Sequence, residues 1–329
     1  TKTLAVLLAF LTFFILLSFF FNFIKIDEAK KFTLSQGNSE NNDNIAVINI
    51  NGPIINDTSS LINFNYTNFI HPTKIKNYLD EIVKIDPKVV IFRINSPGGT
   101  VGATNEIYDI ISEFKKNNKI EIIFFTDYLL ASGGYWISLS GDSIFANYGS
   151  IIGSIGVSGP QWIFFNKPIS ISTGYFGENV DTKDGIEFFS QNSGESKDLF
   201  NPFRKPTDKE LRHLKTITNN IYSDFSILVS KKRKIELSTI KNEIGALIFD
   251  TKLAKEKFLI NDTISFETLL ERIKIKYKFN EFNIYENKIK KSFFEFLYLD
   301  LLVKKNENIF CNQIKSSYSV ILPNYLYQC

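Results

Sequence analysis

The pattern of apolar and polar residues sets the start of the chain apart from the rest. Residues 4–24 read LAVLLAFLTFFILLSFFFNFI, with no charge and only Thr12, Ser18 and Asn22 as polar residues. About 20 consecutive apolar residues match the hydrocarbon thickness of a bilayer. A cleaved signal peptide has a shorter apolar region and a cleavage site of the A-x-A type, and neither is present. We therefore expect a transmembrane anchor over residues 1–25, with a cleaved leader as the alternative.

A polar segment rich in Asn and Ser follows the apolar run. We expect residues 26–44 to form a linker between the membrane anchor and a folded domain. Lys2 precedes the apolar run, whereas Lys25, Lys30 and Lys31 follow it. Because Lys and Arg favour the cytoplasmic side, this charge pattern by itself predicts that the C-terminal part lies in the cytoplasm.

From residue 45 onward, strand patterns and helix patterns alternate. Nearly continuous apolar runs at 45–52 (IAVINING), 88–94 and 120–126 are typical of strands covered on both faces. Apolar residues at helical spacing in 74–85 and 104–116 predict amphipathic helices between these strands. The alternation predicts a layered α/β domain.

The second half of the chain is less regular. ISIST (169–173) and IEFFSQ (186–191) are candidate strands, and residues 207–233 predict a long amphipathic helix. Thr207 is its expected N-cap, and Glu210 would complete a capping box. Shorter helical segments follow, up to residue 278.

Residues 280–329 form a C-terminal extension of unknown role. Their apolar stretch SFFEFLYLDLLV (292–303) could be a core helix, an amphipathic segment on the membrane or, as we favour, a surface that packs on a neighbouring subunit. The extension also holds both cysteines, Cys311 and Cys329. They form no CxxC motif and have no histidine cluster nearby, which argues against a metal site. A disulfide between them requires a tail outside the cytoplasm.

Glycine-rich turns carry the candidate chemistry. Asn95-Ser96-Pro97-Gly98-Gly99 follows an apolar strand, Ala131-Ser132-Gly133-Gly134 precedes a helical stretch, and Gly153-Ser154-Ile155-Gly156 comes after both. Glycines beside a serine let backbone N–H groups approach one point, as a nucleophile with an oxyanion hole requires. The structural alternative is a pair of tight strand-to-helix turns with Ser132 as an N-cap.

Four motifs in order (INSPGGTV, ASGGYW, GSIGV and SKDLFNPFR) resemble the S49 family of Ser/Lys membrane peptidases, the signal peptide peptidase A group. The resemblance runs from about Ile45 to about Phe279, which we expect to be the peptidase domain. No tandem repeat is visible, so the chain is similar to the short, single-unit form. The resemblance implies a crotonase/Clp-type fold of ββα units.

A serine nucleophile needs a base, and the chain has only two histidines. His71 precedes a proline, His213 lies on the long predicted helix, and neither is near the glycine motifs in sequence. A lysine can act as the base when burial keeps its amine neutral. The resemblance assigns this role to Lys197 of SGESKD, before NPFR, and makes Ser154 the accessory serine that orients the amine.

The resemblance further implies an oxyanion hole formed by the backbone N–H groups of Gly98, Gly99 and Gly133. The sequence departs from the family pattern at Tyr148 (usually Pro), Phe200-Asn201 (usually Gly-Ser) and Lys257 (usually Gly). None of these departures removes a reacting group.

The function implied is that of a serine endopeptidase anchored by a single span in the bacterial inner membrane, with its catalytic domain on the extracytoplasmic side. Its substrates would be remnant signal peptides and other unfolded apolar peptides, and its protomers would form a homo-oligomeric ring. No metal or organic cofactor is implied. A net charge of only +3 gives no nucleic-acid footprint. The alternatives are a catalytically silent scaffold that binds membrane proteins and a crotonase-like acyl-CoA enzyme.

Overall fold

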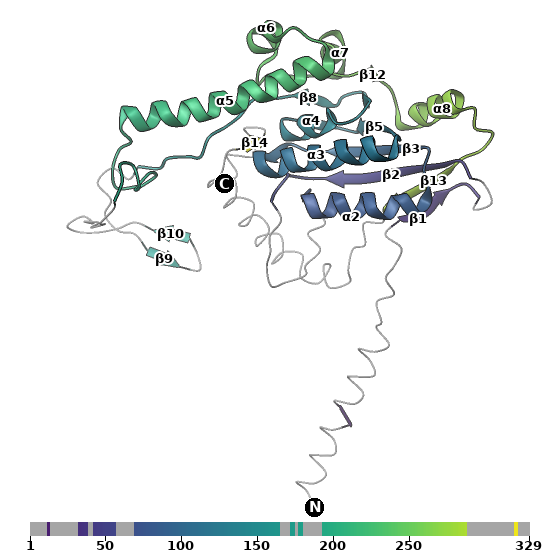
Figure 1. The fold of residues 1–329 in the computed structure, drawn as a ribbon, viewed down its shortest axis with the longest axis horizontal. Coiled ribbons are helices and arrows are strands. Elements are labelled where there is room, and N and C mark those ends of the chain that lie inside the picture. The colour runs from purple at the N-terminus through teal and green to yellow at the C-terminus, as the bar shows by residue number, and fades with distance from the viewer. Residues whose placement is uncertain are drawn as a thin grey trace, which may run out of the picture.

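A seven-stranded sheet forms the centre of the molecule in the computed structural model, which describes residues 12–13, 32–38, 42–56, 69–164, 172–174, 177–179, 193–287 and 319–321 (Figure 1). All neighbouring strands of this sheet are parallel except the first pair. Their spatial order is β1 (Phe32–Gln36), β13 (Asn283–Asn287), β2 (Asn44–Asn51), β3 (Val89–Asn95), β5 (Glu121–Thr126), β7 (Ser143–Ala146) and β12 (Asp262–Thr263).

Helices cover both faces of the sheet. Alternate residues of each strand point to opposite faces, so apolar side chains on both faces pack against helices. In β2, Ala46 and Ile48 face the larger core, which includes residues of α2 (Pro72–Ile82) and α3 (Val101–Asn118). Ile45 and Val47 face a smaller core with α8 (Phe266–Tyr277). The two-sided burial explains the nearly continuous apolar runs and confirms the α/β prediction.

A smaller set of strands lies beyond the carboxyl ends of β3 and β5. The strands β11 (Ile248–Phe249), β8 (Ile151–Gly153) and β6 (Leu129–Ala131) form one sheet, and β6 leads directly into the short helix α4 (Gly133–Ser138). The strand β4 (Gly98–Thr100) precedes α3 and pairs with β14 (Ser319–Ile321). These short strands bring the glycine motifs into one region.

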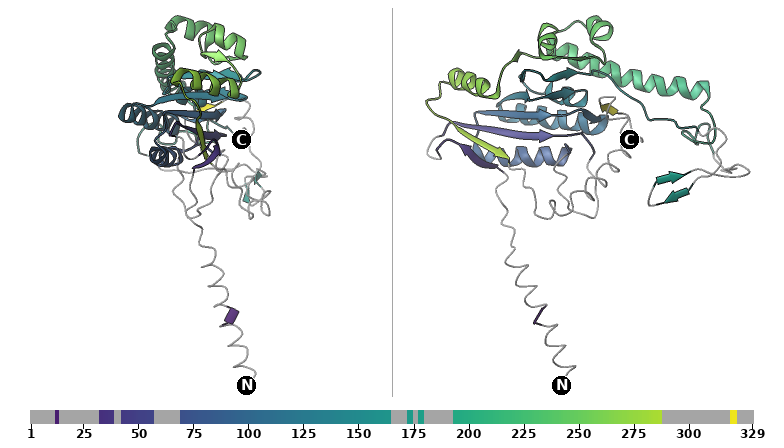
Figure 2. Two further views of the ribbon diagram at one scale, coloured as in Figure 1. Left: turned by 90° about the vertical axis from the view of Figure 1, so that its right-hand side faces the viewer. Right: turned by 180° about the vertical axis from the view of Figure 1, so that it is seen from behind.

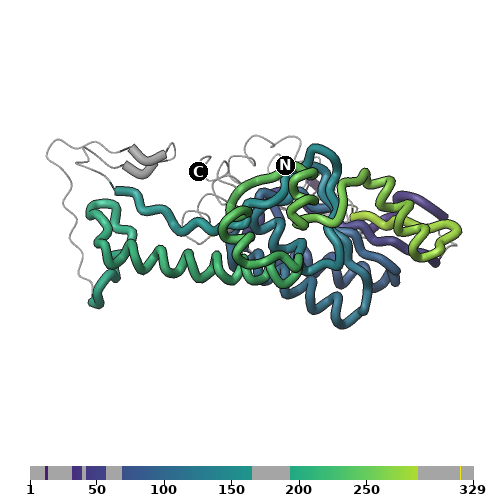
Figure 3. The backbone as a smooth tube through the Cα atoms, turned by 90° about the horizontal axis from the view of Figure 1, so that it is seen from above, coloured from purple at the N-terminus to yellow at the C-terminus, as the bar shows by residue number. Residues whose placement is uncertain are grey.

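The helix α5 (Asp208–Arg233) has one half on the domain and one half in an arm that projects from it (Figure 3). Its 26 residues correspond to about 39 Å. Phe225 and Val229 in the C-terminal half are buried in the larger core. Thr207 caps the other end, and the capping box with Glu210 is present as predicted. The 3-10 turn η1 (Val83–Ile85), α6 (Leu237–Thr239), the π-helical turn η2 (Ile240–Ile244), α7 (Thr251–Glu256) and the hairpin β9 (Ser172–Gly174)–β10 (Gly177–Asn179) complete the elements.

The sheet extends beyond the domain limits expected from the sequence. Residues 32–36, inside the expected linker, form the edge strand β1, and residues 283–287, inside the expected extension, form β13. Both strands are short. β1 pairs with β13, and β13 pairs with β2. These pairings join residues far apart in the sequence, so the local pattern of polar residues does not predict them.

Several expectations fall outside the described residues. These are the strand over 186–191, the first part of the strand over 169–173, the apolar stretch 292–303, Cys311 and Cys329, and residues 4–24 apart from 12–13. Within the residues that the structure describes, no helix has both the length and the apolar character needed to cross a membrane.

Candidate active site

Ser132 lies at the turn between β6 and α4. Its backbone has φ 53° and ψ −117°, a sparsely populated conformation for a residue other than glycine. Its N–H donates to the carbonyl of Gly153 at 2.8 Å, which ties the turn to the end of β8. The residue is 1% exposed, and its Oγ has no hydrogen-bond partner among the described residues. Ser132 therefore occupies the N-cap position without capping the helix through its side chain, so capping does not explain this hydroxyl.

The glycines around Ser132 are required by close packing. A Cβ on Gly134 would lie 2.9 Å from the Cβ of Ser96, and a Cβ on Gly99 would lie 1.8 Å from the carbonyl oxygen of Ile54. Gly98 has φ +99°, which favours glycine. Its N–H donates to Ser96 Oγ at 3.2 Å. Gly133 is the first residue of α4, so its N–H has no acceptor within the helix.

Ser154 lies beside Ser132, at the end of the neighbouring strand. β6 and β8 run parallel, with Ala131 opposite Gly153, so the two serines each follow the last residue of adjacent strands. Ser154 has φ 54° and is 3% exposed, and its N–H donates to Leu247 O at 2.7 Å. The structure thus brings together the predicted nucleophile and the predicted accessory serine.

Lys197 lies elsewhere, in an exposed turn on the arm. Asp198 and Arg204 of the same motif, together with Glu210 of α5, hold this turn in place. Arg204 donates to both carboxylate oxygens of Asp198 (2.6 and 2.7 Å) and to both of Glu210 (2.9 and 2.7 Å). These hydrogen bonds lower the pKa of both carboxyl groups below their usual range. The Arg204 guanidinium also lies 5.2 Å from the ring centroid of Trp162.

The arm keeps Lys197 away from Ser132 within one chain. Trp136 of α4 stacks on Phe225 at 4.6 Å between ring centroids, whereas the Lys197 turn is tied through Arg204 to Glu210. Fifteen helical residues separate Glu210 from Phe225, which corresponds to about 22 Å along α5. Figure 1 shows this separation between α4 and the free end of α5.

The departures from the family pattern are accommodated locally. Tyr148 is 88% exposed. Phe200 adopts φ 68°, and its ring lies 5.3 Å from that of Trp162. After Lys257, whose φ is −86°, the positive φ of the turn is taken by the exposed Phe258 at 60°.

A polar network that the sequence analysis missed fixes the turn leading to Ser132. The Asn95 side-chain oxygen accepts from Thr126 Oγ1 and from the N–H groups of Asp127 and Tyr128 at 3.0–3.1 Å. Asp127 in turn binds Arg93 through two hydrogen bonds of 2.7 Å. Burial alone would raise the pKa of Asp127, but the hydrogen bonds and charge of Arg93 outweigh it and lower the pKa. The available signal was a polar residue at the carboxyl end of each of two apolar runs, Asn95 after 88–94 and Asp127 after 120–126.

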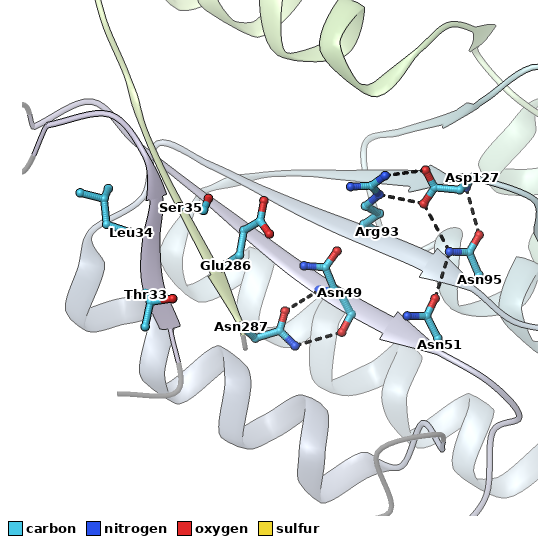
Figure 4. A pocket seen from close by; sticks show the side chains of 10 residues that line it. All are labelled: Thr33, Leu34, Ser35, Asn49, Asn51, Arg93, Asn95, Asp127, Glu286 and Asn287. Carbon is cyan, nitrogen blue, oxygen red and sulfur yellow. Dashed lines mark hydrogen bonds and ion pairs between the residues drawn. The ribbon is translucent and has the colours of Figure 1, made fainter. Parts of the chain in front are cut away.

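This network borders a cavity of about 550 Å³ at the carboxyl ends of the central strands (Figure 4). Side chains of β1, β2, β3 and β13 line it together with Asp127. Ser132, Ser154 and Lys197 do not line it, so the cavity is distinct from the candidate active site. In the described part of the chain, no cluster of three or more His, Cys, Asp or Glu side chains could hold a metal ion.

The chain is similar in sequence to several known proteins. The "Putative signal peptide peptidase SppA" of Enterococcus faecium is 29% identical over 268 residues, which cover 80% of this chain and 71% of that protein. "Protease 4" of Haemophilus influenzae is 28% identical over 228 residues, 69% of this chain but 34% of that protein.

Among solved structures, the 1510-N membrane protease of Pyrococcus horikoshii, described as specific for a stomatin homolog, aligns with a TM-score of 0.41 and 13% identity. The alignment covers 79% of this chain and 99% of that one. The model of peptidase family S49 matches residues 114–280, about half of the chain, including Ser132, Ser154 and Lys197. The chain therefore belongs to peptidase family S49.

Proposed function

We propose that the chain is a serine endopeptidase in which Ser132 is the nucleophile and Lys197 the general base. The observation that supports the proposal is the burial and backbone conformation of Ser132. In a chain of a peptidase family, its hydroxyl is buried and without a hydrogen-bond partner in the described structure, on a strained turn beside Ser154. Strain of this kind persists where the surrounding structure requires it, and it concentrates at functional sites.

The chemistry follows from the groups at this turn. The neutral amine of Lys197 takes the Ser132 proton as Oγ attacks the peptide carbonyl, and the resulting ammonium then protonates the leaving amine. Water hydrolyses the acyl-enzyme by the same route. The N–H of Gly133 is suited to stabilise the oxyanion, whereas that of Gly98 already donates to Ser96 Oγ and that of Gly99 lies on the edge of β4 that pairs with β14. The Ser154 hydroxyl orients the amine.

The base comes from a second subunit in this proposal. Lys197 is exposed, and its turn is tied to Glu210, about 22 Å along α5 from Phe225, which contacts the Ser132 helix; this arrangement favours a base from another chain. An arm that projects from the domain can instead present Lys197 to a neighbour, and repetition of that contact around an axis closes a ring. The proposed assembly is a homo-oligomeric ring with each site shared between two chains.

The proposed setting is the bacterial inner membrane, with residues 4–24 as a single anchor and the domain on the extracytoplasmic side. This orientation follows the family and runs against the lysines that follow the apolar run. The proposed substrates are remnant signal peptides and other unfolded apolar peptides.

Labelling with a fluorophosphonate tests the nucleophile. We expect stoichiometric modification at Ser132, with a rate that rises with pH because the base must be neutral. Ser132→Ala should abolish labelling. Ser138→Ala is the matched control. This buried serine of the same helix donates its hydroxyl to Tyr135 O, so its loss should leave labelling of Ser132 unchanged. An unlabelled Ser132 in folded, assembled protein would favour a silent scaffold or an acyl-CoA enzyme instead.

A further inference from the structure

One face of the central sheet changes from apolar to polar along its strands. In β2, Ile45 and Val47 face the smaller core with α8. Asn49 and Asn51 follow on the same face, because alternate residues of a strand point to the same side. The neighbouring segments show the same change, and their polar residues on this face are Arg93 and Asn95 of β3, Glu286 of β13 and Asp127 after β5. The helix α8 therefore covers the amino ends of the strands, and in the right-hand view of Figure 2 the arrowheads of β2 and β13 point away from it.

The carboxyl ends of these strands form the floor of the cavity of about 550 Å³, at a point where the winding of the chain changes. From β2 the chain adds β3, β5 and β7 in succession on one side, whereas β13 is added on the other side of β2 after the chain has crossed from β12. Side chains of both β13 and β2 line the cavity. Ligands of open α/β sheets bind outside the carboxyl ends of the strands at such a switch point.

Several polar groups that line the cavity are not used by the fold. Among the described residues, the Glu286 carboxylate and the side-chain amide of Asn49 have no hydrogen-bond partner. Asn49 is bound to Asn287 only through its backbone N–H and C=O, at 2.7 and 3.0 Å (Figure 4). The side-chain oxygen of Asn51 accepts from Asn95 at 3.0 Å, which leaves the two N–H groups of Asn51 available. The cavity thus offers both donors and acceptors to a ligand.

Two opposite charges face the cavity from different strands. Glu286 in β13 is level with Val47 of β2, whereas Arg93 in β3 is level with Asn49. Their Cα atoms are therefore about 10 Å apart across the sheet and about 7 Å apart along it. Nε and Nη2 of Arg93 donate to Asp127, and in Figure 4 the third guanidinium nitrogen points away from Asp127, to the side on which Glu286 lies. The hydrogen bonds to Asp127 raise the pKa of Arg93 most, and the charge of Glu286 raises it further.

We propose that this cavity binds the α-ammonium group and the adjacent carbonyl group that free amino acids and peptide N-termini share. The ammonium donates to the Glu286 carboxylate and to the side-chain oxygen of Asn49. The carbonyl or carboxylate oxygen accepts from the third guanidinium nitrogen of Arg93 and from the side-chain amide of Asn51. Hydrogen bonds with an ionised donor or acceptor are about twice as strong as neutral ones, so the two charged ends fix the orientation of the ligand.

The charge and size of the cavity agree with this class of ligand. Its lining carries one positive side chain, Arg93, and two negative ones, Asp127 and Glu286, which disfavours a simple anion and favours a ligand that carries an ammonium group. The volume of about 550 Å³ lies within the range of about 300–1,000 Å³ that is usual for small-molecule sites. The inference does not rest on the proposed function, although hydrolysis of peptides would release ligands of this class.

Calorimetric titration of full-length Ser132→Ala protein tests the site with probes that stay intact. The probes are L-leucine and the peptide Leu-Ala-Ala, each also in its N-acetylated form. We expect acetylation, which removes the ammonium group, to weaken binding at least about tenfold. Binding of L-leucine would identify free amino acids as ligands, and binding of Leu-Ala-Ala alone would identify peptide N-termini. Either result supports the inference.

Substitutions then locate the binding in the cavity. Glu286→Gln keeps the shape of the side chain but removes its charge, so the affinity for the free probes should fall at least about tenfold. Glu281→Gln is the matched control, because this exposed glutamate precedes the same strand and the change in net charge is equal. Asn49→Ala should weaken binding several-fold while its backbone bonds to Asn287 remain. The melting temperatures should stay equal, because neither Glu286 nor Asn49 has a side-chain partner in the described structure.

Three results would overturn the inference. Equal affinities in Glu286→Gln and Glu281→Gln would place the binding outside the cavity. Equal affinities for the free and the acetylated probes would show that no ammonium group is recognised. A Kd above about 1 mM for both free probes would mean that the cavity is not a site for this class of ligand. Because Ser132→Ala protein is used, none of these results depends on whether the chain cleaves peptides.

Discussion

The surroundings of Ser132 and those of Lys197 are built by different forces. Ser132 is fixed by main-chain pairing, because β6 lies between Ser96 and β8 and its turn is closed by a bond to Gly153 O. Lys197 is exposed, and its turn is held by charged side chains around Arg204 on the arm. The proposed nucleophile is therefore part of the folded core, whereas the position of the proposed base depends on what the arm contacts.

The largest expected effect tests whether Ser132 of one subunit acts together with Lys197 of another. Ser132→Ala and Lys197→Ala should each lower kcat/KM for a peptide substrate by about 10³-fold or more, because they act as one unit. Mixing the two inactive proteins should restore about a quarter of the wild-type activity, since random assembly places an intact Lys197 beside an intact Ser132 in one site out of four.

The control for this mixture is a demonstration that subunits exchange, by energy transfer between separately labelled proteins. If exchange is complete and the mixture stays inactive at every ratio, each site is built within one chain, and the arm must move to reach its own serine.

A smaller effect is expected when the turn at Ser132 is crowded. Gly134→Ala places a Cβ 2.9 Å from the Ser96 Cβ, so we expect a loss of about 1–3 kcal/mol in the free energy of unfolding together with reduced labelling of Ser132. Gly102→Ala is the matched control, because its Cβ would meet only Asn56 Oδ1 at 3.4 Å and a helical alanine is favoured. Chemical denaturation measures both. Equal stability of the two variants would mean that the turn tolerates a shift.

The smallest effect concerns the arm alone. Glu210→Gln removes one carboxylate from Arg204, so amides of residues 196–207 should exchange faster and kcat/KM should fall several-fold, while the melting temperature of the domain stays the same. Glu195→Gln is the control, because its pair with Lys209 is exposed on both sides. A lower melting temperature in Glu210→Gln would show that the arm is part of the cooperative core.

The same carboxylates set the pH response of the arm. Arg204 lowers the pKa of Asp198 and Glu210 in the folded state. Their contribution is therefore complete above the unfolded pKa of about 4 and is lost as the pH falls through the lower folded values. Protection of the arm should persist in wild-type protein at about pH 4 and disappear below it. Loss of protection well above pH 5 would contradict the ion cluster.

Local patterns predicted much of the fold because they depend on neighbouring residues. The apolar runs predicted β2, β3 and β5, and Thr207 with Glu210 predicted the start of α5. Polar edge strands were not predictable in this way, since β1 exists through pairing with β13 about 250 positions away.

Some features of the candidate site were likewise predictable from local motifs, and others were not. The motifs alone pointed to Ser132, Ser154 and Lys197. The Asn95–Asp127–Arg93 network was missed because Arg93 and Asn95 lie in β3 while Asp127 follows β5, and they meet only at the carboxyl edge of the sheet.

The sequence by itself predicted the family, the α/β class and two candidate site serines, because these predictions depend on local motifs and on short-range periodicity. Only the tertiary structure decided that Ser132 Oγ is buried without a partner in the described residues, that Lys197 lies near the far end of α5, and that β14 pairs with β4 at Gly99. Each of these depends on backbone groups far apart in sequence finding the same hydrogen-bonding edge or the same core, and such long-range pairing leaves no local pattern along the chain.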